Sequence, residues 1–151
     1  MIKYNKIIPA IINYLKQHHS LTGVNIEQGK FNEIPTVAPA VWVYIEPARN
    51  GLSDINLAPI IKKAKVTFFA FADASGDKTS ASIASVDLIE EIESIILSPS
   101  FTDYINQHED NIDSYFTKVS YTDSEQPLNF DAVYSDFAVS YLEIWINYAS
   151  S

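Results

Sequence analysis

The stretch VYSDFAVSYLEIWINY, residues 133–148, holds the longest uninterrupted run of strand-forming residues in the chain. Its valine, aromatic and isoleucine residues are typical of a pleated, half-buried surface, and no proline or glycine follows position 131. Alternation along a strand gives one face as Phe137, Val139, Tyr141, Glu143 and Trp145, and the other as Ala138, Ser140, Leu142, Ile144, Ile146 and Tyr148. Both faces are partly apolar, which predicts a central strand that is covered on two sides.

The composition indicates one globular domain over residues 1–151, with 47% hydrophobic and 19% charged residues. A net charge of −9 disfavours long-range attraction to nucleic acid or to anionic lipid, so we expect neither as a partner. The absence of cysteine excludes disulfides and cysteine-ligated zinc. No signal peptide or long apolar span is recognisable, so we expect the protein to be made and kept in a cytoplasm.

Two long amphipathic helices are predicted. Residues 5–18 carry an apolar stripe at helical spacing, formed by Ile7, Ile8, Ile11, Ile12, Tyr14 and Leu15. Pro9 is tolerated only near a helix start, so this helix either begins just before it or is kinked in its first turn, and His18 and His19 fall in its last turn. The second helix is capped by Thr79 or Ser80 and ends at Ser98, with an apolar face of Ala81, Ser85, Leu88, Ile89, Ile92, Ile95 and Ile96. A short third helix, capped by Ser100, is expected over residues 101–108.

Further strands are expected at residues 24–31, 40–46, 63–73 and 113–122, the first of them at a sheet edge. The strands at 40–46 and 63–73 are consecutive and separated by a long connection, which favours an antiparallel pair. The order of elements predicts an α+β fold: a mainly antiparallel sheet with two principal helices packed on one face.

No sequence motif for catalysis is present. His108 lies close to Glu109, Asp110 and Asp113, but no second histidine stands at ligand spacing and the segment has the composition of a polar turn. The four glycines are isolated, and Arg49 is the single arginine, which excludes an arginine cluster for phosphate. We therefore expect no enzymatic activity, no catalytic residue, no cofactor and no metal.

The strands carry aromatic residues on the face away from the predicted helices. If the helices cover Val41, Val43, Ile45, Val66 and Phe68, the opposite face holds Trp42, Tyr44, Phe69, Phe71 and Trp145. A large exposed patch of this kind is typical of a protein interface. The alternative is that residues 24–31, the connection around Asn50 or the third helix covers these side chains within one subunit.

Four segments together resemble the tail terminator and tail completion proteins of phages and prophages, including the related Mu-like family of small tail proteins. They are the opening helix MIKYNKIIPAIINYLK, the stretch PAVWVYIEPAR, the strand KVTFFAFADASGD before the second helix, and the long closing strand. The resemblance implies a non-catalytic structural protein, assembled as a ring of six that caps the tail tube and helps to join tail to head. Its implied partners are further copies of itself, the major tail tube protein and the head–tail connector protein.

The same resemblance implies a location in the host bacterial cytoplasm during assembly and then in the virion tail. The competing classes are a non-enzymatic adaptor that acts as a monomer or dimer, and an enzyme with an unrecognised carboxylate site.

The connection of residues 48–59 is longer than two paired strands require. We expect it to dock on the tail tube through Arg49, Asn50, Gly51, Leu52, Ile55 and Leu57. Asn50 and Gly51 permit positive φ, and the apolar side chains offer surface that binding could bury. The alternative is that Ile55 and Leu57 pack against the sheet of the same subunit.

Overall fold

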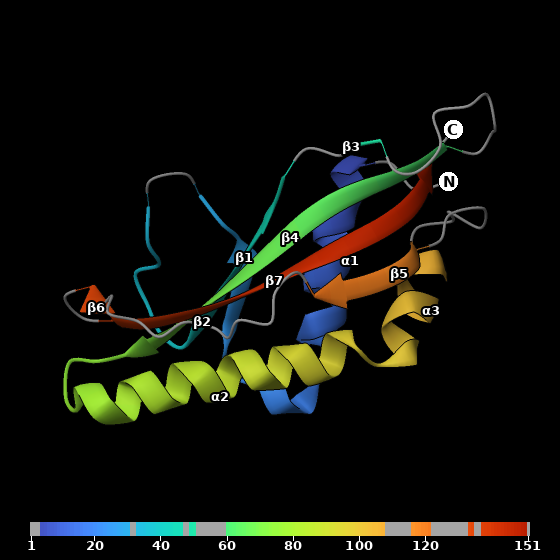
Figure 1. Cartoon of the computed structure of the whole chain (residues 1–151). Coiled ribbons are helices and arrows are strands. Elements are labelled where there is room, and N and C mark those ends of the chain that lie inside the picture. The colour runs from blue at the N-terminus through green and yellow to red at the C-terminus, as the bar shows by residue number, and fades with distance from the viewer. Residues whose placement is uncertain are drawn as a thin grey trace.

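The computed structural model describes residues 4–30, 33–46, 49–50, 60–107, 116–121, 133–134 and 137–150. It has the predicted α+β fold, in which helices pack on one face of a mixed, mainly antiparallel sheet (Figure 1). The strands are β1 Asn25–Gln28, β2 Ala40–Ile45, β3 Arg49–Asn50, β4 Ile60–Asp73, β5 Phe116–Tyr121, β6 Val133–Tyr134 and β7 Phe137–Ser150. Their order across the sheet is β1-β2-β4-β7-β5, with β3 paired to β4 and β6 paired to β7.

The longest pairing in the sheet joins β4 and β7, which run antiparallel over fourteen residues each. Because β5 pairs with the other edge of β7, the predicted central position of the closing strand is confirmed. The sequence predicted one strand over 133–148, whereas the structure has β6 at 133–134 and β7 extending to Ser150. The predicted antiparallel pair of β2 and β4 is also present.

One strand pair departs from the antiparallel pattern. β1 lies at a sheet edge, as predicted, but it pairs with β2 in parallel, with Ile26 opposite Val41. Parallel neighbours cannot be joined by a tight hairpin, so the chain must travel back along the strand direction before β2 begins. The connection between β1 and β2 makes this return.

The first helix, α1, spans Tyr4–Lys16 and contains Pro9 at an exposed position. It therefore starts earlier than predicted. The placement of His18 and His19 in its last turn is wrong: the helix ends at Lys16, His18 is extended, and His19 opens the short 3-10 helix η1, His19–Leu21. Because α1 ends at Lys16 and η1 follows, Leu21 is buried in the core beside α1.

The second helix, α2, spans Lys78–Ile96 and is capped by Asp77 rather than by Thr79 or Ser80. The Asp77 carboxylate accepts hydrogen bonds from the Thr79 backbone N–H at 3.0 Å and from the Ser80 hydroxyl at 2.8 Å, and these bonds lower the pKa of Asp77. The third helix, α3, spans Pro99–Gln107, so it starts two residues earlier than predicted. Proline suits a first helical position, because the N–H it lacks has no partner there.

The main core lies between the three α-helices and one face of the sheet. It is formed by buried side chains of α1, α2 and α3 with those of β2, β4 and β7. The strand residues on this face include Val41, Val43, Val66, Phe68 and Ile144, as the alternation predicted. The sheet face that the helices cover is thus the one expected from the sequence.

A polar contact crosses this core. The hydroxyls of Ser85 in α2 and Ser140 in β7 lie 2.8 Å apart and are both buried, and the Ser85 hydroxyl also donates to the Ser82 carbonyl at 2.9 Å. With that donor used, the Ser140 hydroxyl is the donor to Ser85. The pair fixes one position of α2 along the central strand.

We expect Ser85→Ala to lower the free energy of unfolding by about 1–3 kcal/mol, because it leaves the Ser140 hydroxyl buried without an acceptor. The double variant Ser85→Ala, Ser140→Ala should be less destabilised than the sum of the single variants, since it removes both partners. Urea unfolding of the four proteins checks this cycle. Strict additivity would show that the two hydroxyls are not coupled.

Candidate functional site

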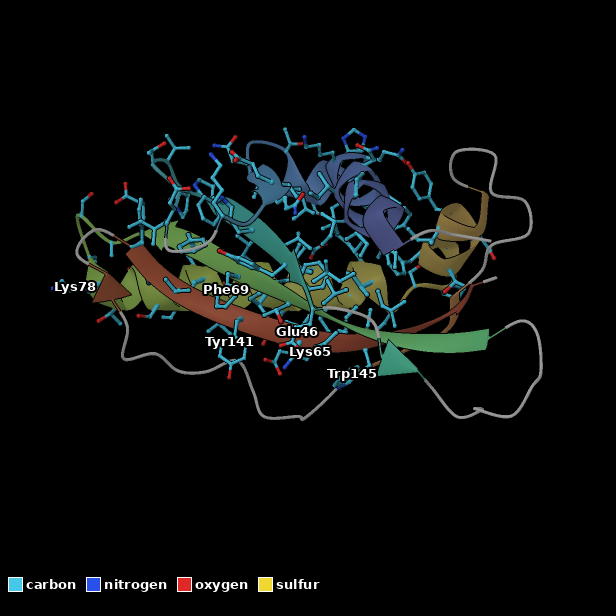
Figure 2. All side chains as sticks on the ribbon, turned by 90° about the horizontal axis from the view of Figure 1, so that it is seen from above. Glu46, Lys65, Phe69, Lys78, Tyr141 and Trp145 are labelled. Atoms are coloured by element: carbon cyan, nitrogen blue, oxygen red, sulfur yellow. The ribbon has the colours of Figure 1, made fainter. Side chains whose placement is uncertain are left out.

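The second face of the sheet carries aromatic side chains on three neighbouring strands, β2, β4 and β7. Strand register brings together Trp42 and Phe69, and then Phe69 and Tyr141, across β2, β4 and β7. Figure 2 shows Tyr141, Lys65 and Trp145 on the side of the sheet opposite to α1. We call the following set the aromatic face: Trp42, Tyr44, Phe69, Phe71, Phe137, Tyr141 and Trp145.

Six rings of the aromatic face form two contacting groups, one around Phe69 and one around Phe71. Tyr44 and Phe69 meet edge to face at a centroid distance of 5.4 Å, and Phe69 and Tyr141 lie 5.8 Å apart. Phe71 makes edge contacts with Trp42 at 5.9 Å and with Phe137 at 6.2 Å. Such contacts between rings fixed on paired strands give the surface a defined shape.

Exposure differs along the aromatic face. Trp42 and Phe71 are 3% and 5% exposed, so the sequence-based expectation of an exposed patch is wrong for these two residues. Tyr44, Phe69, Phe137, Tyr141 and Trp145 are partly exposed. The surface available to a partner therefore lies mainly on β7 and the middle of β4.

The connection between β1 and β2 accounts for part of the burial. Residues 33–37 and Trp42 line the same small cavity of about 160 Å³, which places this connection on the second face, and Pro35 is buried there. The backbone of Gly29 lies against the Tyr44 ring so closely that a Cβ at this position would clash with it. The Tyr44 hydroxyl donates to the Lys30 carbonyl at 3.2 Å.

Burial affects two polar groups in this part of the aromatic face, the Tyr44 hydroxyl and the Trp42 indole N–H. Burial raises the pKa of the Tyr44 hydroxyl, and the negative charge of Glu33 raises it further. The indole N–H of Trp42 is buried and has no hydrogen-bond partner among the residues that the structure describes. A buried donor without an acceptor costs stability, so packing around the Trp42 ring must offset this loss.

A charged group lies beside the exposed aromatic residues. The Lys65 ammonium is 3.3 Å from a Glu46 carboxylate oxygen and 3.6 Å from one of Glu143, so it bridges β4 to a residue at the end of β2 and to β7. Burial acts to lower the pKa of Lys65, but hydrogen bonding to Glu46 and the charges of Glu143 and Glu46 raise it on balance. Lys65 is opposite Trp145 in the strand register, which places this network next to the aromatic face.

The other residues singled out from the sequence are placed only in part. Arg49 and Asn50 form β3, paired with Lys63 and Lys62, so they belong to the sheet rather than to a free loop. Gly51, Leu52, Ile55 and Leu57 lie outside the described residues, as do His108, Glu109, Asp110 and Asp113. Docking of the connection on a tail tube remains a prediction.

Sequence reasoning did not single out Phe137, Tyr141 or the Lys65 network as part of a site. Alternation alone put Phe137 and Tyr141 on the same strand face as Trp145, but the neighbours of that face depend on the register between β4 and β7. The Lys65 network likewise unites residues 46, 65 and 143, which no local pattern connects.

Comparison with models of known protein families and with curated proteins finds no match to this chain. In the part of the chain that the structure describes, no three His, Asp or Glu side chains gather in a way that could hold a metal ion. A search of the same residues finds no helix with the length and apolar character needed to cross a membrane.

Because Trp42 is buried and Tyr141 is not, truncating them should affect folding differently. We expect Trp42→Ala to lower the free energy of unfolding by about 3–5 kcal/mol, and Tyr141→Ala by about 1 kcal/mol. Urea unfolding at low protein concentration, where any association is suppressed, measures both. Equal losses for the two variants would contradict this division of the aromatic face into a buried and an open part.

Proposed function

We propose that the protein is a non-catalytic structural subunit that binds other protein subunits through the open part of the aromatic face. The observation that carries this proposal is the set of partly exposed rings on the sheet face opposite to the helical core, Phe69, Phe137, Tyr141 and Trp145, of which Phe69 and Tyr141 contact each other. Contiguous apolar patches on protein surfaces mark contact sites, and tyrosine and tryptophan are enriched where binding energy concentrates.

The surroundings of the rings fit such a role. These rings stand on two paired strands, β4 and β7, so little conformational entropy is lost when a partner orders them further. Lys65, Glu46 and Glu143 supply a polar margin beside the apolar surface, in the arrangement common to protein interfaces. The charges are already paired with one another, which lowers the cost of covering them.

The resemblance to phage tail terminator and tail completion proteins extends the proposal. On this basis the subunit forms a ring of six that caps the tail tube, stops its growth and presents a surface to the head–tail connector protein. An α+β subunit whose helices occupy one sheet face leaves its other face for a neighbour, and a ring requires two different contact surfaces on each copy. Assembly takes place in the host bacterial cytoplasm, and the ring then remains in the virion tail.

The proposal predicts that Tyr141→Ala and Phe69→Ala weaken self-association by roughly 2 kcal/mol, or about thirtyfold in Kd, because interface anchors concentrate binding energy. Ile83→Ala is the matched control, since Ile83 is 58% exposed but lies on α2 away from the aromatic face. Sedimentation across a concentration series measures all four proteins. Association unaffected by the aromatic variants would remove the basis of the proposal, and a stable dimer would favour the adaptor alternative.

The tail-tube contact is tested separately. Deleting residues 52–58 still allows a short connection between Asn50 and Lys62, which the strand register holds opposite each other. We expect the shortened protein to fold and to fail in tail completion, seen by electron microscopy as overlong or headless tails. A control with Leu52, Ile55 and Leu57 replaced by serine keeps the length and tests the apolar groups alone. Normal tails from the deletion variant would refute docking by this connection.

A further inference from the structure

A small cavity lies beside Trp42, between the sheet and the connection from β1 to β2. It is lined by Asn25 and Glu27 of β1, by Trp42 of β2, and by residues 30 and 33–37 of the connection. Its volume of about 160 Å³ is room for a group the size of several water molecules.

Trp42 places an unused hydrogen-bond donor at this cavity. Its side chain is 3% exposed, and the indole N–H has no acceptor among the described residues. Buried donors in native folds nearly always have a partner, so an orphan donor calls for an explanation. Because the N–H itself is buried, an acceptor from outside reaches it only if part of the cavity wall moves.

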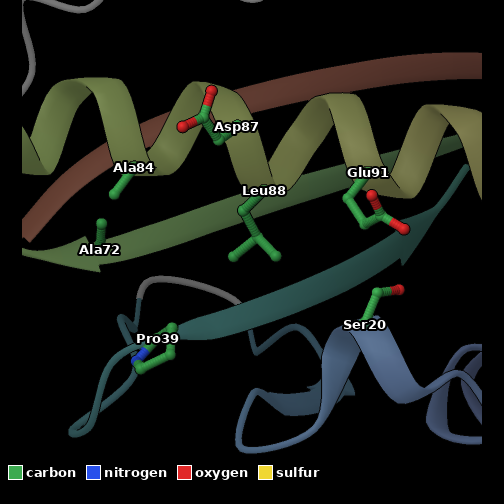
Figure 3. A pocket seen from close by; sticks show the side chains of 7 residues that line it. All are labelled: Ser20, Pro39, Ala72, Ala84, Asp87, Leu88 and Glu91. Carbon is green, nitrogen blue, oxygen red and sulfur yellow. The ribbon is translucent and has the colours of Figure 1, made fainter.

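The connection that forms this wall is held at both of its ends. The backbone N–H of Gly29 donates to the Val43 carbonyl at 2.9 Å, and the N–H of Asn25 donates to the Pro39 carbonyl at 3.0 Å. Pro39 also borders a groove beside α2, which Leu88 lines from the helix (Figure 3). Movement of the wall is therefore confined to the middle of the connection.

The middle of the connection, residues 33–37, is held less firmly. Pro35 is buried, but its apolar neighbours Ile34 and Val37 are 45% and 51% exposed. Apolar side chains that stay largely in water contribute little to holding a segment in place. Outward movement of residues 33–37 therefore loses mainly the burial of Pro35.

The charges around the cavity favour one kind of acceptor. Glu27 and Glu33 carry two negative charges and Lys30 one positive charge, so the lining is negative on balance. The negative charge of Glu33 also helps to raise the pKa of the neighbouring Tyr44. A carboxylate would be repelled here. A neutral amide offers a carbonyl to the Trp42 N–H, and its own N–H groups can donate to the carboxylates.

We propose that this cavity is an amide-binding site, in which Trp42 donates its indole N–H to the carbonyl oxygen of an asparagine or glutamine side chain of the bound subunit. Residues 33–37 move outward as the amide enters, and the carboxylate of Glu27 or Glu33 accepts from the amide N–H. The inference rests on the proposed subunit binding and names a contact within it. Trp42 is opposite Phe69 in the strand register, so one partner can reach both the cavity and the open rings.

Acetamide is the probe for the free subunit, because it carries the amide group alone. The chain has two tryptophans, so a nitrogen–proton NMR spectrum has two indole signals, and Trp42→Phe identifies the signal of Trp42 by its loss. At a protein concentration below self-association, we expect acetamide to move this signal downfield and to saturate with a Kd in the millimolar range, as suits so small a ligand. Acetate should not move it, and the Trp145 signal reports the effect of the solvent.

The variant Pro35→Ala tests the movement of the connection. It weakens the closed form of residues 33–37, so less free energy is needed to open the cavity, and acetamide should bind at least about twofold more tightly. Thermal unfolding verifies that the variant is folded. Equal or weaker binding by the folded variant would overturn the outward movement.

Sedimentation tests the same contact in the assembled protein. Trp42→Phe keeps an aromatic ring and removes the donor, so we expect association to weaken about tenfold. Val139→Ala is the matched control, since Val139 is buried in the same small core and loses apolar volume without a polar group. This control should associate as the wild type does.

The possible results separate this inference from the proposed function. If the wild type associates but acetamide moves the Trp42 signal no more than acetate does, the amide site is overturned and the proposed function stands. Equal weakening by Trp42→Phe and Val139→Ala has the same meaning. A saturable acetamide shift in a wild type that stays monomeric at every concentration supports the site and overturns self-association instead.

Discussion

The fourteen-residue antiparallel pairing of β4 and β7 is the constraint on which the rest of the structure depends. It fixes which residues of the two longest strands share a face, because a shift of one position would exchange the two faces entirely. In the observed register, Val66 and Ile144 face the helices, whereas Phe69 and Tyr141 face away. The apolar core and the aromatic face are thus two consequences of one register.

Because β1 pairs with β2 in parallel, one part of the aromatic face is buried within the subunit and another part stays open. The returning connection between these strands lies on the second face and meets Trp42, so this corner becomes a small second core within the subunit. The rings on β7 are farther from that connection and stay partly exposed. Trp42 and Phe71 are therefore core residues of this corner, whereas Phe69 and Tyr141 keep part of their surface exposed.

Much of this arrangement follows from sequence alone. Alternation was sufficient to assign Trp42, Phe69 and Trp145 to the face away from the helices, because side-chain direction in a strand is a local property. The exposure of Trp42 was not predictable, since it depends on a parallel pair and on a proline-containing connection that joins distant positions. The predicted end of the first helix was wrong for a similar reason. α1 ends before His18 and His19, because Leu21 after them is buried in the core.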